Sequence, residues 1–187
     1  GYDYTDDDLK DVRAAYEASC RYIADEIEVF VRRLIDDEYF DPAKDILVFT
    51  ADHGECLRPS VGMLGHTPPA FYDDILNVPL VIACPEWSKQ RVTEQVSLID
   101  LMPTVLDLAG VKVPETAEGT AASTPTDLQR DIAVSVTKNP SDEGWKIFRC
   151  ARSEAGRKIF AQFDDQTLFT SHESCGEYDQ EIVLATE

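Results

Sequence analysis

Residues 48–55 read Val-Phe-Thr-Ala-Asp-His-Gly-Glu, and this stretch is the clearest indication of fold class in the chain. The apolar run 46–49 ends abruptly before an acid and a histidine, Asp52 and His53, which a glycine follows. A short run that is apolar on both faces predicts a buried strand of the central parallel kind. Open α/β sheets bind ligands at the carboxyl ends of their strands, and Gly54 allows the turn that brings the two side chains together. The stretch therefore predicts an α/β sheet with a ligand site at this strand end.

Asp52 and His53 are the first candidate metal ligands. A carboxylate beside an imidazole suits Zn²⁺ or Mn²⁺, and suits Ca²⁺ less well. The same pair also occurs in helix caps and loops, so the local pattern leaves both interpretations open. His66 lies in a glycine- and proline-rich stretch, 55–70, which we expect to be a functional loop without regular structure. It is a candidate catalytic residue, a third metal ligand, or an exposed loop histidine, while Glu55 is a candidate orienter of His53.

A long helix is expected before this strand, over residues 5–37. Thr5 is its expected N-cap, because the acids that follow it suit the positive end of a helix. Apolar residues at spacings of three and four predict one continuous stripe along this helix. The stripe consists of Val12, Tyr16, Cys20, Ile23, Ile27, Phe30 and Leu34.

Further strands and a second helix are expected after the loop. Residues 78–84 form an apolar run typical of a strand, and 92–96 predict a short additional strand. Asp100 is the expected cap of a helix that ends near Leu108, with Gly110 as its stop signal. The chain therefore begins with alternating strands and helices.

The C-terminal part predicts a small antiparallel sheet. Residues 111–130 are rich in Thr, Ala and Pro and are expected to be a connector. We divide the chain into an α/β part, 1–125, and a small antiparallel subdomain, 126–187. The expected strands of this subdomain are 132–136, 146–152, 158–163 and 166–170.

The charge of the chain excludes several partners. The sequence carries 36 acids against 17 bases, a formal charge of −19. Such a surface repels nucleic acid and anionic membranes, so neither is an expected partner, and no apolar stretch is long enough to cross a bilayer. Spread acidity with seven lysines indicates a cytoplasmic protein of an extreme halophile, and an acidic mesophilic protein is the alternative. Five cysteines without close pairs agree with a reducing compartment.

Three segments together resemble the sulfatase family of the alkaline phosphatase superfamily. They are 48–55, 72–82 with Tyr-Asp-Asp-Ile-Leu-Asn-Val-Pro-Leu-Val-Ile, and 97–110 with Ser-Leu-Ile-Asp-Leu-Met-Pro-Thr-Val-Leu-Asp-Leu-Ala-Gly. Their order and spacing match the family over about residues 10–110. The resemblance implies a large mixed sheet between helices, followed by a smaller antiparallel C-terminal subdomain.

The resemblance also implies a site and a reaction. Asp52 and His53 match the late pair of metal ligands, and His66 falls where the family often has an active-site histidine. Sulfatases generally bind Ca²⁺, whereas phosphatase and phosphonate-hydrolase relatives bind Zn²⁺ or Mn²⁺. The implied activity is metal-dependent hydrolysis of an anionic sulfate ester.

Two departures qualify the resemblance. Nothing in the chain matches the family's nucleophile segment, so we expect a C-terminal portion of a sulfatase that is inactive by itself. The haloarchaeal origin is expected from the acidity of the chain. Many sulfatases have a lysine just after the loop histidine, but Thr-Pro-Pro follows His66 here. The alternatives are a phosphodiesterase or phosphonate monoester hydrolase of the same superfamily, or a non-catalytic sulfatase-like domain.

Overall fold

The computed structural model describes residues 5–58, 63–66, 71–141, 144–153, 158–164 and 167–172. The chain divides into two compact units. The first consists of residues 1–66 and 77–85, and the second consists of residues 67–76 and 86–187. The domain boundary near residue 125 stays a prediction.

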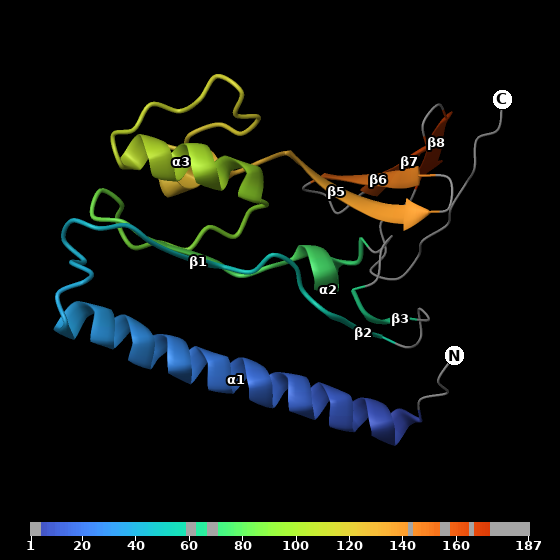
Figure 1. The fold of residues 1–187 in the computed structure, drawn as a ribbon, viewed down its shortest axis with the longest axis horizontal. Helices are drawn as coiled ribbons and strands as arrows, with labels where there is room; N and C mark the ends of the chain where they lie inside the picture. The colour runs from blue at the N-terminus through green and yellow to red at the C-terminus, as the bar shows by residue number, and fades with distance from the viewer. Residues whose placement is uncertain are drawn as a thin grey trace. The chain divides into compact units, whose positions relative to one another are not determined.

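The first unit begins with one uninterrupted helix, α1 (Asp6–Asp36), coloured blue in Figure 1. Thr5 caps it: the hydroxyl of Thr5 accepts a hydrogen bond from the backbone N–H of Asp8 at 3.2 Å, and the Asp8 carboxylate accepts one from the Thr5 N–H at 2.9 Å. This reciprocal pair satisfies two backbone donors that a bare helix end leaves unpaired. The predicted helix and its N-cap are confirmed.

The apolar stripe of α1 is only partly covered. Tyr16 is 42% exposed, Ile23 53% and Phe30 59%, whereas Ile27 and Leu34 are half-buried. The helix therefore keeps the predicted periodicity, but the described part of its unit leaves much of the stripe in solvent.

The strand that follows α1 pairs differently from the prediction. β1 (Leu47–Thr50) pairs antiparallel with β4 (Leu80–Ala83). Phe49 lies opposite Val81, and both side chains are exposed, by 37% and 58%. The expectation of a buried, central parallel strand is therefore wrong for this described pair, because an apolar run indicates a strand but specifies neither its partner nor what covers its faces.

The predicted structureless loop contains a short hairpin. β2 (Cys56–Arg58) pairs antiparallel with β3 (Met63–Gly65), and Cys56 lies opposite Gly65. Cys56 is fully buried. Part of the expected loop, residues 59–62 and 67–70, lies outside the described residues.

The second unit contains a short helix, α2 (Asp73–Leu76), and the helix α3 (Leu101–Leu108), which the 3-10 turn η2 (Leu98–Asp100) precedes. Gly110 follows α3 with φ +68°, the left-handed conformation expected of a helix stop. The predicted strand at 92–96 is reduced to one isolated bridge between Val96 and Gln129.

Asp100 has a different role from the predicted helix cap. Its side chain makes no capping hydrogen bond and is 1% exposed. Its carboxylate accepts hydrogen bonds from the Thr120 backbone N–H at 2.7 Å and from Arg130 Nε at 2.6 Å, and Arg130 Nη2 completes a bidentate pair. Burial raises the pKa of Asp100, but the hydrogen bonds from Arg130 and Thr120 outweigh it, so the pKa lies below its ordinary value. We call Asp100, Thr120 and Arg130 the clasp.

The clasp holds the connector closely against η2. A Cβ placed on Gly119 would overlap the carbonyl of Ile99, so only glycine fits at this approach. Close by, the buried hydroxyl of Thr104 accepts a hydrogen bond from the Ala122 N–H at 3.0 Å. The connector ends in the 3-10 turn η3 (Pro125–Leu128).

The predicted C-terminal antiparallel sheet is confirmed. Its four strands follow the order β5-β6-β7-β8, and each pairs antiparallel with its neighbour in sequence. Residues 154–157, between β6 and β7, lie outside the described residues. The strands are β5 (Ile132–Ser141), β6 (Gly144–Ser153), β7 (Lys158–Asp164) and β8 (Thr167–His172).

Within the described residues, no helix combines the length and the apolar character that a membrane-spanning segment requires.

Candidate metal centre

Asp52 and His53 lie just beyond the carboxyl end of β1. The Asp52 carboxylate accepts a hydrogen bond from the backbone N–H of His53 at 2.9 Å. Its other oxygen lies 3.7 Å from His53 Nε2, although the Asp52 side chain is 88% exposed. Two ligands of one divalent ion lie about 3–3.5 Å apart when each is bound at about 2.0–2.5 Å. These two atoms are therefore close to the separation that a shared ion requires.

The ring of His53 is oriented by its own backbone. His53 Nδ1 lies 2.9 Å from the carbonyl oxygen of Gly54. A carbonyl oxygen only accepts, so in this contact Nδ1 carries the proton and Nε2 of the neutral ring carries the lone pair. A hydrogen bond from the second ring nitrogen is the usual way in which proteins orient a metal-binding histidine.

Glu55 and His66 meet at the open end of the hairpin. Because Cys56 lies opposite Gly65, the next residues outward, Glu55 and His66, come to face each other. His66 Nδ1 lies 3.0 Å from Glu55 Oε2. The carboxylate accepts this hydrogen bond, so the lone pair of a neutral His66 is on Nε2.

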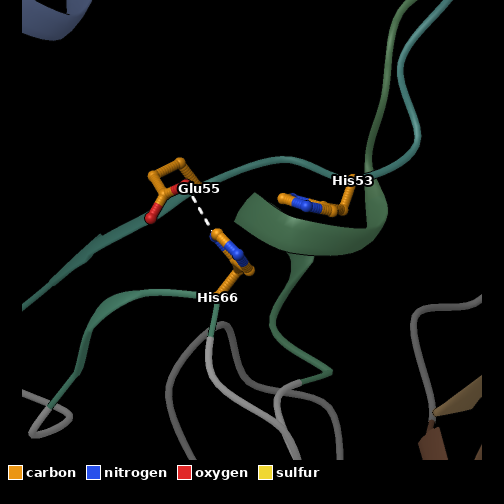
Figure 2. Close-up of side chains that lie close together, drawn as sticks. All are labelled: His53, Glu55 and His66. Atoms are coloured by element: carbon orange, nitrogen blue, oxygen red, sulfur yellow. Dashed lines mark hydrogen bonds and ion pairs between the residues drawn. The ribbon is translucent and has the colours of Figure 1, made fainter.

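The strand end and the hairpin place three metal-binding side chains together. His53, Glu55 and His66 each offer a ligand atom, and these atoms all lie within 4.8 Å of one another. Figure 2 shows Glu55 and His66 pointing toward each other, with the ring of His53 beside them. The two imidazole rings are tilted by 34°, with centroids 4.1 Å apart. Two imidazoles and one carboxylate form a donor set that fits a divalent ion.

The sequence anticipated part of this arrangement. His53 and His66 were predicted as site residues, and the structure brings them together. Asp52 was predicted as well, and it lies next to His53 but outside the cluster of three. Glu55 was expected to orient His53, but it contacts His66 instead. The pairing of Glu55 with His66 was missed because it depends on the hairpin register, which no local pattern indicated. The roles assigned to Asp52, His53 and His66 remain predictions.

Helix α1 supports the hairpin from the same unit. Arg13 Nη2 donates a hydrogen bond to the carbonyl oxygen of Leu57 at 3.0 Å. Tyr16, one turn further along α1, has a pKa raised above its ordinary value, first by partial desolvation, then by Cys20, with a contribution from the charge of Glu55. The hairpin is thus attached to a long helix next to the three-residue cluster.

His172 is the remaining histidine of the chain. It ends β8 in the second unit, and its side chain lies outside the described part of the chain.

Three relatives illustrate what this chain is similar to. It is 24% identical over 172 residues to arylsulfatase K of Xenopus laevis, covering 90% of this chain and 31% of that protein. It is 38% identical over 73 residues to the uncharacterized sulfatase YidJ of Escherichia coli strain K12, covering 39% of this chain and 14% of that protein. It is also 32% identical over 119 residues to 2,3-bisphosphoglycerate-independent phosphoglycerate mutase of Rhodopirellula baltica, covering 62% of this chain and 20% of that protein.

The chain thus spans about a third or less of the length of these relatives. No solved structure matches it. The sulfatase family model matches residues 1–111, a range that includes α1, the strand end and the whole hairpin. Because this match covers more than half of the 187 residues and contains the candidate metal centre, the chain belongs to the sulfatase family.

Proposed function

We propose that the protein containing this chain is a metal-dependent hydrolase of sulfate esters. In this proposal Asp52 and His53 bind a divalent ion and His66 is the third residue of the active site. In this proposal the nucleophile belongs to a part of the protein outside these 187 residues, since the chain spans about a third or less of the length of its relatives. A cytoplasmic location belongs to the same proposal and rests on the composition of the chain.

One observation carries the proposal: the strand end and the hairpin bring His53, Glu55 and His66 within 4.8 Å of one another. These residues lie inside the range that matches the sulfatase family. Ligand side chains that converge at the carboxyl end of a strand are typical of α/β hydrolytic sites. A structural role for this strand end would not require three metal-binding groups at one point.

The reaction sets the task of these residues. Hydrolysis of a sulfate ester breaks an S–O bond and releases an alcohol and a sulfate ion. A bound divalent ion would screen the ester and stabilise charge on the nucleophile and the transferring group. Asp52 and His53 would hold that ion, and His66 would bind either the ion or the ester anion.

A second candidate function is hydrolysis of a phosphate or phosphonate ester in the same site. It is favoured by the similarity to a phosphoglycerate mutase over 62% of the chain. It is also favoured by the absence of a lysine after His66, where the sequence continues Thr-Pro-Pro. A non-catalytic domain is the remaining alternative.

The test is an assay of the full-length protein. We expect it to hydrolyse 4-nitrophenyl sulfate faster than bis(4-nitrophenyl) phosphate or 4-nitrophenyl phenylphosphonate. Asp52→Ala and His53→Ala should each lower kcat/KM by about a hundredfold or more, because they remove metal ligands. His172→Gln, at the end of β8, is the matched histidine control and should leave the rate unchanged.

Two results would contradict the proposal. Faster cleavage of a phosphorus ester than of the sulfate ester would favour the second candidate. Absence of hydrolysis of all three esters, by a protein that is folded and loaded with divalent ion, would favour a non-catalytic domain.

A further inference from the structure

We infer that His53, Glu55 and His66 together form a binding site for a transition-metal ion of the Zn²⁺ or Mn²⁺ class. This inference rests on the proposed function and deepens it, since it names the ligands and the class of ion at the same site. Two of the three ligands, Glu55 and His66, flank the β2–β3 hairpin. Neither belongs to the Asp-His pair at the end of β1.

The geometry of the cluster requires little adjustment. Its ligand atoms already lie within 4.8 Å of one another. Ligands of one Zn²⁺ ion lie about 3.3 Å apart when their bonds are about 2.0 Å long and tetrahedral. Movements of about 1 Å by each side chain would bring the ligand atoms to that separation. The two rings, tilted by 34° with centroids 4.1 Å apart, would also have to turn so that both lone pairs point to one ion.

The two histidines would bind through different ring nitrogens. His53 Nδ1 is 2.9 Å from the Gly54 carbonyl, an oxygen that only accepts, so a neutral His53 has its lone pair on Nε2. His66 Nδ1 is 3.0 Å from Glu55 Oε2, close to the separation of two ligands on one ion. His66 would therefore bind through Nδ1, with its ring proton moved to Nε2.

The hairpin is built to keep Glu55 and His66 in register. Gly65 is the last residue of β3, directly before His66, and has φ +114°, a conformation that L side chains rarely adopt. A Cβ at Gly65 would stand 3.4 Å from Glu55 Oε1, an ordinary van der Waals contact, so the constraint at this position is its backbone conformation. The hydrogen bond from Arg13 to Leu57 ties the same hairpin to α1.

The donor set indicates the class of ion. Ca²⁺ takes six to eight oxygen ligands, whereas imidazole nitrogen suits Zn²⁺ and its neighbours. Two neutral imidazoles and the Glu55 carboxylate leave one positive charge on a divalent ion. Asp52, with an oxygen 3.7 Å from His53 Nε2, can balance that charge as a fourth donor.

The experiment is a calorimetric titration of the complete 187-residue chain with ZnCl₂, MnCl₂ and CaCl₂ in concentrated KCl near neutral pH. We expect one Zn²⁺ per chain and much weaker binding of Ca²⁺. Glu55→Gln and His66→Gln should each weaken Zn²⁺ binding by about tenfold or more. His172→Gln should bind as the parent chain does, and circular dichroism of each variant checks that it is folded.

Histidine ¹⁵N spectra supply a second measurement that does not depend on activity. The chain has three histidines, so the ring signals are few. Zn²⁺ should shift the ring signals of His53 and His66 and leave those of His172 in place. A shift of His53 alone would overturn the inference.

The outcomes separate the inference from the proposed function. Loss of Zn²⁺ binding in His53→Gln, with unchanged binding in Glu55→Gln and His66→Gln, would overturn the inference and leave the proposed function intact. Equal affinities for Ca²⁺ and Zn²⁺ would overturn the ion class. Zn²⁺ binding by all three residues in a protein that hydrolyses no ester would support the site and contradict the proposed function.

Discussion

Glu55 Oε2 and His66 Nδ1 lie 3.0 Å apart across the open end of the β2–β3 hairpin. Neither residue belongs to a strand: Glu55 directly precedes β2, and His66 directly follows β3. The hairpin therefore fixes the pair as directly as it would fix a cross-strand pair within a sheet. This relationship places a carboxylate and an imidazole beside the Asp-His end of β1.

Gly65→Ala should weaken metal binding more than it weakens the fold. An alanine at φ +114° is strained by about 1–3 kcal/mol, and relief of that strain would turn His66 away from Glu55. Calorimetry should therefore show weaker Zn²⁺ binding. Gly110→Ala is the control, since Gly110 also has a positive φ, +68°, with nothing within 4 Å of its added Cβ. Equal Zn²⁺ affinities for the two variants would refute the prediction.

Arg130→Ala should destabilise the second unit, most strongly near neutral pH. Removal of the guanidinium leaves the buried Asp100 carboxylate without its ion-pair partner, at a cost of about 3 kcal/mol. Because the folded-state pKa of Asp100 lies below its ordinary 3.8, the clasp contributes stability above about pH 4 and loses it as the pH falls through the folded pKa. Urea unfolding should therefore show a difference between variant and parent that shrinks below pH 4.

The control for this prediction is Lys44→Ala, which removes an ion pair with Asp41 in which both side chains are exposed. Its effect on unfolding should be small at every pH. An Arg130→Ala effect that stays constant from neutral to acid pH would show that the clasp acts through packing instead of charge.

Gly119→Ala should destabilise the connector by overpacking. The added methyl group would overlap the Ile99 carbonyl, and the backbone would have to move away from η2. The cost of such overpacking is about 1–3 kcal/mol. Thermal unfolding of this variant should begin at a lower temperature than that of Gly110→Ala, where the space is open. The reverse order of stability would argue against the close approach.

Salt should be required for full folding. A formal charge of −19 repels itself across the whole chain, and this repulsion is relieved when ions shorten the range of electrostatic forces. The helical circular-dichroism signal, to which α1 contributes 31 residues, should increase with KCl and then level off. NaCl at the same ionic strength should act alike, because screening does not depend on which monovalent cation is present. Complete folding in dilute buffer would contradict the halophile interpretation.

The features that the sequence predicted well are local in the chain. Thr5 and Asp8 form a capping box three residues apart, so the start of α1 was readable from neighbouring residues. The strands β6 and β7 were likewise predicted from short runs of neighbouring residues, 146–152 and 158–163. Local chemistry was sufficient for these elements.

The features that were missed depend on distant partners. Asp100 has the residue type of a helix cap, but Arg130, 30 positions later, takes its carboxylate into the clasp. The apolar run of β1 specified a strand without specifying its antiparallel partner, β4. For the candidate site, Asp52, His53 and His66 were predicted from the motif at the strand end, from the glycine- and proline-rich stretch and from the resemblance. The contact of Glu55 with His66 required the register of a hairpin that lies within an expected loop.

The short chain distance between Glu55 and His66, 11 positions, has a consequence for how the metal and the fold depend on each other. Closing so small a loop costs little conformational entropy, so the unfolded chain can also chelate an ion with these side chains. A ligand that binds the unfolded state stabilises the native state by less than its affinity for the native state would give. Zn²⁺ should therefore bind this chain more tightly than the rise in its melting temperature suggests, and a thermal-shift screen would underrate the ions that this hairpin holds best.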